Sequence, residues 1–179
     1  SFVNVETDLY SAVFSNRGGT LVSFKLKEYH KFESEDAVNM VDTTKAGSIA
    51  VLFTSGGSRN YDTRSFFFTT DETSGKINAT TSAQTLTYSV GIGEGSMAFT
   101  YTFTPGSYEV GLSIQQNNAS SFSTQDGYEL AWVGGVPFTE GDHKDEGLKS
   151  GAYARSGGEV EAITLASDTF DELSLNGDV

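Results

Sequence analysis

Residues 84–116, QTLTYSVGIGEGSMAFTYTFTPGSYEVGLSIQQ, decide the fold because apolar and polar side chains alternate along most of their length. A period of two places one set of side chains on each face of a β-strand, here an apolar face and a Thr/Ser face. A glycine-rich segment at 91–95 and Pro-Gly-Ser at 105–107 interrupt the alternation, as tight turns do. The stretch therefore predicts three antiparallel strands joined as a meander.

The same alternation recurs in other parts of the chain. Near the N-terminus it ends in a turn at residues 16–19 and then resumes; its apolar members are Tyr10, Ala12, Phe14, Val22, Phe24 and Leu26. Further strands are expected at residues 38–42, 49–54, 65–70, 76–80, 128–133 and 160–165. Roughly eleven or more strands exceed a small immunoglobulin module, so two large antiparallel sheets packed face to face fit better.

The sequence shows no repeat of fixed period and no linker, so we expect residues 1–179 to form a single all-β domain. Helical signals are weak. The spacing Thr169-x-x-Glu172 ahead of Leu173 is that of a capping box and predicts a short helical segment near the C-terminus. The polar and acidic residues 139–150 predict a long loop.

The charge balance limits the classes of partner. Lys and Arg total 11 and Asp and Glu total 24, which gives a net charge of −13. Such acidity disfavours nucleic acids and anionic lipid surfaces, because both carry phosphate. The chain has no cysteine, which excludes disulfides, cysteine-ligated zinc and thiol nucleophiles. No apolar run approaches the roughly 18 residues that a membrane helix requires.

Three groups of residues are candidates for chemical sites. The glycines at 91–95 lead into a strand and not a helix, so we expect a hairpin loop and not a phosphate-binding loop. Residues 140–146 hold four carboxylates and His143, but their spacing fits neither an EF-hand loop nor a two-histidine helical site, and Lys144 opposes a cation, so we expect a solvated charged loop. His30 has no patterned partner. The sequence thus predicts no catalytic, cofactor-binding or metal-binding residue, no cofactor and no enzymatic activity.

Two aromatic segments carry expectations about burial. Trp132 lies in Leu130-Ala131-Trp132-Val133 with apolar neighbours on both sides, so we expect its side chain to be buried. In Phe66-Phe67-Phe68, at least one ring must point away from the face of its own sheet, because successive side chains alternate.

Several short segments resemble one known family when they are taken in order. They are VNVETDLY at 3–10, FSNRGGTL at 14–21, LKEY at 26–29, FTPGSY at 103–108, Asn117-Asn118, WVGGVP at 132–137 followed by Glu140, and Ala152-Tyr153-Ala154. Together they resemble the large periplasmic domain of YidC-type membrane protein insertases. The resemblance covers essentially the whole chain, although each motif alone is common.

The resemblance implies a large twisted antiparallel β-sandwich, a supersandwich of the kind shared with galactose mutarotases, with a short helical segment near the C-terminus. It also implies a location on the periplasmic side of the bacterial inner membrane. Residues 176–179 are expected to end just before the membrane region of such an insertase, so that the parent chain is membrane-anchored and this fragment is soluble. Neither His30 nor His143 matches the catalytic histidine of the mutarotases, so that activity is not carried over.

The leading hypothesis is a non-catalytic periplasmic insertase domain that serves as a scaffold or partner-contact surface. Its partners would be translocon or accessory subunits, and nascent membrane proteins through the membrane core of the parent chain. The alternative is a carbohydrate-binding or mutarotase-like sandwich, and a third reading is a cell-surface adhesion module. A peptide or a sugar-like ligand in the sandwich cleft is a further candidate.

Overall fold

The computed structural model describes residues 1–42, 44, 48–55, 59–124, 128–149, 151–156 and 159–163. The chain divides into two compact units, Ser1–Pro137 and Phe138–Val179. Among the helices of the described ranges, none combines the length and the apolar character that a membrane crossing needs. The prediction that residues 1–179 form a single domain stays a prediction.

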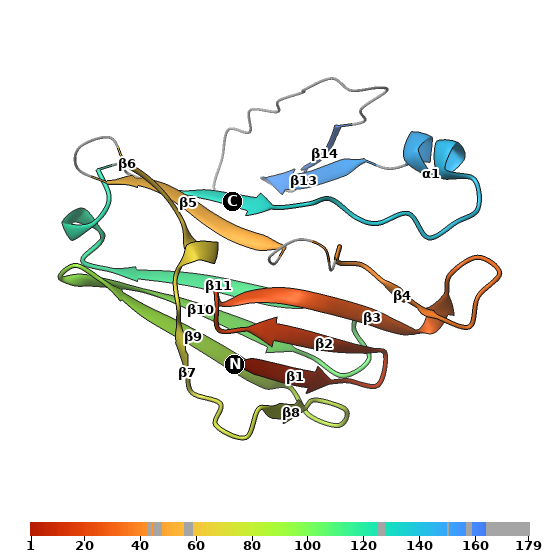
Figure 1. Cartoon of the computed structure of the whole chain (residues 1–179), viewed down its shortest axis with the longest axis horizontal. Coiled ribbons are helices and arrows are strands. Elements are labelled where there is room, and N and C mark those ends of the chain that lie inside the picture. Colours follow the sequence, from red (N-terminus) through yellow and green to blue (C-terminus); the bar gives the residue numbers. More distant parts are fainter. Residues whose placement is uncertain are drawn as a thin grey trace. The chain divides into compact units, whose positions relative to one another are not determined.

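The first sheet of the N-terminal unit contains five strands in the order β4-β3-β2-β1-β8 (Figure 1). Their bounds are β1 Phe2–Glu6, β2 Tyr10–Ser15, β3 Thr20–His30, β4 Ala37–Asn39 and β8 Lys76–Asn78. The pair β1–β8 is parallel, whereas the other pairs are antiparallel. The predicted N-terminal hairpin is confirmed as β2 and β3, and its turn contains Gly18 and Gly19, both with positive φ.

The second sheet contains the predicted meander. Its order is β11-β10-β9-β7, with bounds β7 Thr69–Thr70, β9 Gln84–Ile92, β10 Gly95–Phe103 and β11 Val110–Asn117. Ile92 pairs with Gly95, so the glycine-rich segment is the tight turn of the β9–β10 hairpin, with Gly93 at φ 60°. The expectation of a hairpin loop at 91–95 is therefore confirmed.

The two sheets pack face to face around an aromatic core. The ring of Phe14 in β2 lies 4.6 Å from that of Tyr101 in β10, and the rings of Phe68 and Phe99 are 5.0 Å apart. Fully buried side chains follow every second position of β10, as the alternation predicts. These contacts confirm the all-β sandwich.

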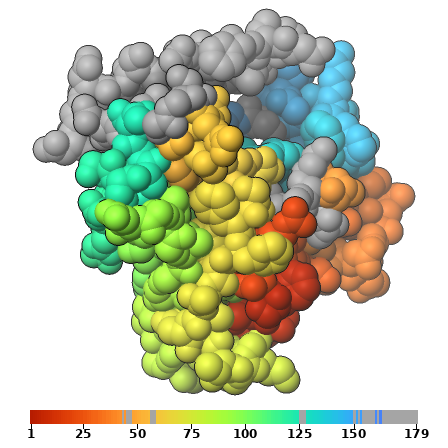
Figure 2. Space-filling model, turned by 60° about the vertical axis from the view of Figure 1, so that its left-hand side comes forward, coloured from red at the N-terminus to blue at the C-terminus, as the bar shows by residue number. Residues whose placement is uncertain are grey.

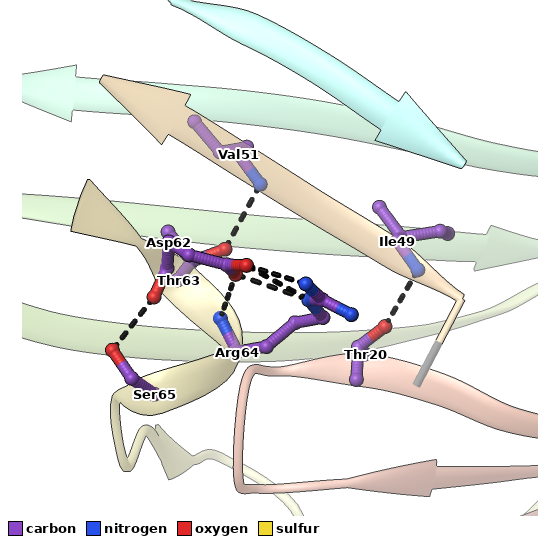
Figure 3. Close-up of polar contacts among 7 residues, drawn as sticks. All are labelled: Thr20, Ile49, Val51, Asp62, Thr63, Arg64 and Ser65. Carbon is purple, nitrogen blue, oxygen red and sulfur yellow. Dashed lines mark hydrogen bonds and ion pairs between the residues drawn. The ribbon is translucent and has the colours of Figure 1, made fainter. Parts of the chain in front are cut away.

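A third sheet completes this unit and connects with the first two. Its order is β12-β5-β6, with bounds β5 Ile49–Ser55, β6 Arg59–Asp62 and β12 Glu129–Trp132. Two buried threonine hydroxyl groups tie β5 to its surroundings (Figure 3): the N–H groups of Ile49 and Val51 donate to the Oγ1 atoms of Thr20 and Thr63, each at 2.9 Å. Because buried backbone donors need partners, these threonines fix where β5 lies.

The connection from β6 to β8 differs from its prediction. The sequence predicts a strand at residues 65–70, but the chain forms a 3₁₀ turn, η1, at Thr63–Ser65 and only the short β7. Figure 2 shows this segment in yellow, running over the surface of the first unit. Phe68 is buried and Phe67 is 69 % exposed, which confirms that one ring of the triplet points outward. Another short 3₁₀ turn, η2, occupies Ala119–Ser121.

The second unit contains a helix and a hairpin in its described part. They are α1 His143–Lys149, β13 Ala152–Ser156 and β14 Glu159–Ile163, and the two strands are antiparallel. The loop predicted for 139–150 is thus wrong. Asp142 begins the helix, because its Oδ1 atom accepts the N–H groups of Lys144 and Asp145 at 3.1 and 3.0 Å, as an N-cap does. The predicted helical segment at Thr169–Glu172 lies outside the described residues.

Candidate functional site: an apolar groove

An open apolar groove of about 370 Å³ reaches the core of the first unit. Side chains from β2, β3, β5, β10 and β11 line it, together with residues in and after β12. Its floor includes Phe14, Leu21 and Tyr101, which belong to the buried core between the two large sheets. The groove therefore lies directly over the buried core of the sandwich.

One wall of the groove is formed by β11 and the residues just before it. Val110 and Leu112 are half-buried and line the groove, whereas Gly111 between them and Ser113 after them are exposed. Tyr108, 38 % exposed, extends this wall ahead of the strand. The alternation predicted for β11 is confirmed, but its apolar face is only half covered, because β11 lies at the edge of its sheet.

The opposite wall is formed by Trp132 and Val136. Trp132 is 48 % exposed, so the prediction that it is buried is wrong. In the described part of the chain, β12 pairs only with β5, and this edge position leaves the ring accessible. The indole Nε1–H donates to the carbonyl oxygen of Gly135 at 3.0 Å, which fixes the orientation of the ring.

The two glycines after β12 are a sequence feature from which this wall could have been predicted. Gly134 and Gly135 have φ values of 92° and 66°, a conformation that glycine adopts without strain. The two glycines turn the chain directly after β12, so that Val136 lines the groove with Trp132. The sequence Trp132-Val133-Gly134-Gly135 thus contains both the ring and the turn whose carbonyl group holds it.

At the end of the groove next to Tyr108, two segments that carry the family resemblance meet. The carboxylate of Asp8 accepts the N–H group of Gly106 at 3.0 and 3.1 Å. The rings of Tyr29 and Tyr108 lie edge to face, with centroids 6.2 Å apart. Loss of solvent raises the pKa of Tyr108, and the negative charges of Glu28 and Asp8 contribute to the rise. This end of the groove is therefore acidic.

A second pocket, of about 270 Å³, lies on the sheet β12-β5-β6. Tyr61 stacks on Phe53 there at 5.4 Å, and Arg59 lowers the pKa of its phenol by a hydrogen bond. The carboxylate of Asp62 is held by the guanidinium group of Arg64 (Figure 3), whose hydrogen bond lowers the pKa of Asp62. The Asp62 carboxylate and the Tyr61 phenol in this lining thus already have hydrogen-bond partners within the protein.

The charged segment 140–146 serves the helix of the second unit. The carboxylate of Glu146 accepts the N–H groups of Thr139 and Glu140 at 3.0–3.1 Å, which lowers its pKa. His143 stacks on Phe138 at 4.7 Å.

Throughout the described ranges, no three His, Asp or Glu side chains come together as a metal site. His30 is exposed at the end of β3. The absence of catalytic, cofactor-binding and metal-binding residues stays a prediction.

Comparisons with known proteins agree on one family. The family model described as YidC periplasmic domain matches residues 2–165. The membrane protein insertase YidC of Chlorobium phaeovibrioides is 32 % identical over 166 residues, which are 92 % of this chain and 28 % of that protein. The same insertase from Prosthecochloris aestuarii is 30 % identical over 174 residues, 95 % of this chain and 30 % of its own length.

The insertase YidC of Chlorobaculum tepidum is 32 % identical over 165 residues, 88 % of this chain and 27 % of that protein. The chain thus spans less than a third of the length of these curated relatives. The match covers both sheets of the sandwich and the groove between its walls. The chain therefore belongs to the YidC periplasmic domain family, and its place is the periplasmic side of the bacterial inner membrane.

Proposed function

We propose that this chain is the non-catalytic periplasmic domain of a membrane protein insertase and that it offers a contact surface to protein partners. The observation that carries the proposal is the groove wall at Trp132, where a large ring is half-exposed and held by its own turn. The family supplies the setting beside the membrane.

The groove has the properties of a protein-contact surface. Its lining is almost entirely apolar, and its walls are aromatic or aliphatic. Exposed apolar patches on soluble domains commonly mark interaction sites, and tryptophan and tyrosine dominate the binding energy of such sites. Because the indole of Trp132 is already fixed, a partner that packs on it loses little additional conformational freedom.

The partners that fit are segments of other proteins with apolar side chains. Translocon subunits, accessory subunits and nascent membrane proteins all present such segments, the last through the membrane core of the parent insertase. The net charge of −13 supports proteins over nucleic acids and over an anionic lipid surface. In this role the domain positions its partners and takes no part in bond chemistry.

A carbohydrate-binding function is the second candidate, and the pocket on β12-β5-β6 favours it. That pocket combines the ring of Tyr61 with the polar side chains of Asn60 and Glu129, a mixture that suits a sugar. Against it, Asp62 is engaged by Arg64, and Arg59 bonds to Tyr61. Binding to a glycan array, or interconversion of sugar anomers by the isolated chain, would support this candidate over the first.

Site-specific photo-crosslinking in the full-length insertase tests the contact function. A photoreactive phenylalanine analogue replaces Trp132 in one variant and Phe67 in the other. Phe67 is the matched control, because its ring is exposed but does not line the groove. We expect discrete crosslinks to membrane or secreted proteins from position 132 and at least fivefold weaker ones from position 67. Equal crosslinking at the two positions, or none at either, would contradict the proposal.

A further inference from the structure

We infer that the outer edge of β11 is a docking strand for an extended polypeptide with alternating apolar side chains and a basic residue at its end next to Tyr108. The inference rests on the proposed contact function of the groove and specifies the form of the partner. Its basis is the juxtaposition of an unpaired strand edge, an apolar groove and an acidic groove end.

The first observation is that the edge of β11 is unprotected. Among the described residues, β11 pairs only with β10, and all eight of its residues keep a regular register in that pair. Its sequence, VGLSIQQN, contains no charged residue and no proline. Soluble proteins usually protect an exposed edge with charges, proline or a bulge, because its unpaired N–H and C=O groups attract other strands. This edge has none of those devices.

The second observation is the direction of the side chains. A strand added beside β11 places its side chains on the same two faces as those of β11. One of those faces carries Val110 and Leu112, which line the groove opposite Trp132. Every second residue of the added strand would then enter the groove, while its main chain pairs with β11. This is the arrangement of β-strand addition, in which the main chain gives affinity and alternate pockets give specificity.

The third observation is the charge at one end of the groove. Asp8, Glu28 and Glu109 lie at or next to the Tyr108 end of β11, and Lys27, which neighbours Glu28 in β3, is already paired with Glu6. The rest of the lining is uncharged. A basic residue of the partner at this end is attracted, and an acidic one is repelled. An apolar segment flanked by lysine or arginine therefore fits better than an acidic segment or a neutral sugar.

Trp132 gives a direct readout, because it is the single tryptophan of the chain and forms a groove wall. The probe is an eight-residue peptide in which Val and Thr alternate and one end carries two lysines. We expect it to shift the emission of Trp132 with saturation. Replacing the two lysines by glutamates should weaken binding at least fivefold. Two further peptides carry methyl groups on their backbone nitrogens, one at the odd positions and one at the even positions. One of these two frames should bind at least tenfold more weakly, because it has lost the N–H donors that face β11.

Two variants at neighbouring positions of β11 complete the test. Leu112→Glu places a charge on the groove face and should weaken binding of the peptide at least tenfold. Ser113→Glu places the same charge on the exposed face and should leave binding within twofold. The milder Leu112→Ala serves if Leu112→Glu loses the circular dichroism of the wild type.

The outcomes separate this inference from the proposed function. Saturable binding that neither methylated frame weakens would overturn strand addition and leave an apolar contact groove. If the peptide does not shift the emission of Trp132 but position 132 still crosslinks in the full-length insertase, strand docking at β11 is overturned and the proposed contact function is not. A dimer of the chain that the peptide does not dissociate, seen by sedimentation and weakened by Leu112→Glu, would assign the edge to a second copy and overturn the inference.

Discussion

The hydroxyl group of Tyr101 donates a hydrogen bond of 2.7 Å to the carbonyl oxygen of Gly19, and this bond joins the two large sheets. Tyr101 lies in β10 of one sheet, and Gly19 precedes β3 of the other. The tyrosine is fully buried, and burial raises the pKa of its phenol, so that it remains a donor at neutral pH. A polar bond inside an aromatic core helps to fix how the sheets pack, because an unmade bond there is costly.

Replacement of Tyr101 by phenylalanine should destabilise the domain by about 1–3 kcal/mol, because the Gly19 carbonyl is left without this donor. Tyr88→Phe is the matched control: Tyr88 is equally buried, but its hydroxyl has no hydrogen-bond partner in the described part of the chain. We expect that control to change stability by less than about 0.5 kcal/mol or to increase it. Urea unfolding measures both. Equal losses of unfolding free energy in the two variants would show that the hydrogen bond to Gly19 does not contribute to stability.

Gly19 itself should tolerate no side chain. Its φ is 57°, and a Cβ atom would lie 3.2 Å from the side chains of Phe99 and Tyr88. Gly19→Ala should therefore cost more than about 2 kcal/mol, from backbone strain and from the displaced rings. Gly106→Ala isolates the backbone part, because Gly106 has a φ of 71° and no atom within 4 Å of the added Cβ. We expect about 1 kcal/mol there. A smaller loss for Gly19→Ala than for Gly106→Ala in urea unfolding would refute the crowding argument.

The strands of the sandwich could be predicted where a local pattern determines them. The meander and the N-terminal hairpin alternate with a period of two between glycine turns, and these short-range signals survive in the structure. β6 reads RNYD, without apolar alternation, and it forms because Leu52 and the three residues after it in β5 pair with it. Pairing between segments of this kind leaves no trace in the local sequence.

The groove could not be predicted from the sequence for a similar reason. The burial of Trp132 depends on whether another strand follows β12 in its sheet, and its apolar neighbours in sequence say nothing about that. The loop predicted for 139–150 failed because one capping residue, Asp142, outweighs the polarity of the segment. The place of β12 in its sheet decided the first outcome, and a capping contact decided the second.

Alkaline pH should unfold the domain through its buried tyrosines. Burial raises the pKa of Tyr10 to about 12, against about 10 in an unfolded chain. A raised pKa means that the folded state holds the proton more tightly. Its stability is therefore complete below about pH 10 and is lost as the pH rises toward 12. Burial also raises the pKa values of Tyr88 and Tyr101.

The free energy of unfolding should thus fall above pH 10 by about 1.4 kcal/mol per pH unit for each buried tyrosine. Urea unfolding at pH 8 to 12, with tyrosinate absorbance followed in parallel, measures the slope. Tyr88→Phe should reduce this slope by the contribution of one buried tyrosine. A free energy of unfolding that stays constant between pH 10 and 11.5 would contradict the burial of these phenols.

Trp132 should matter for binding and little for stability. Its ring is 48 % exposed, so Trp132→Ala should lower the free energy of unfolding by less than about 1.5 kcal/mol. The groove loses one wall, and its affinity for an apolar fluorescent dye such as anilinonaphthalene sulfonate should fall about tenfold, which corresponds to about 1.4 kcal/mol. Leu130→Ala is the control, because Leu130 is exposed on the same strand but does not line the groove. We expect that variant to bind the dye as the wild type does. If Leu130→Ala weakens dye binding as much as Trp132→Ala, the apolar surface of β12 as a whole binds the dye, and the groove has no special part in it.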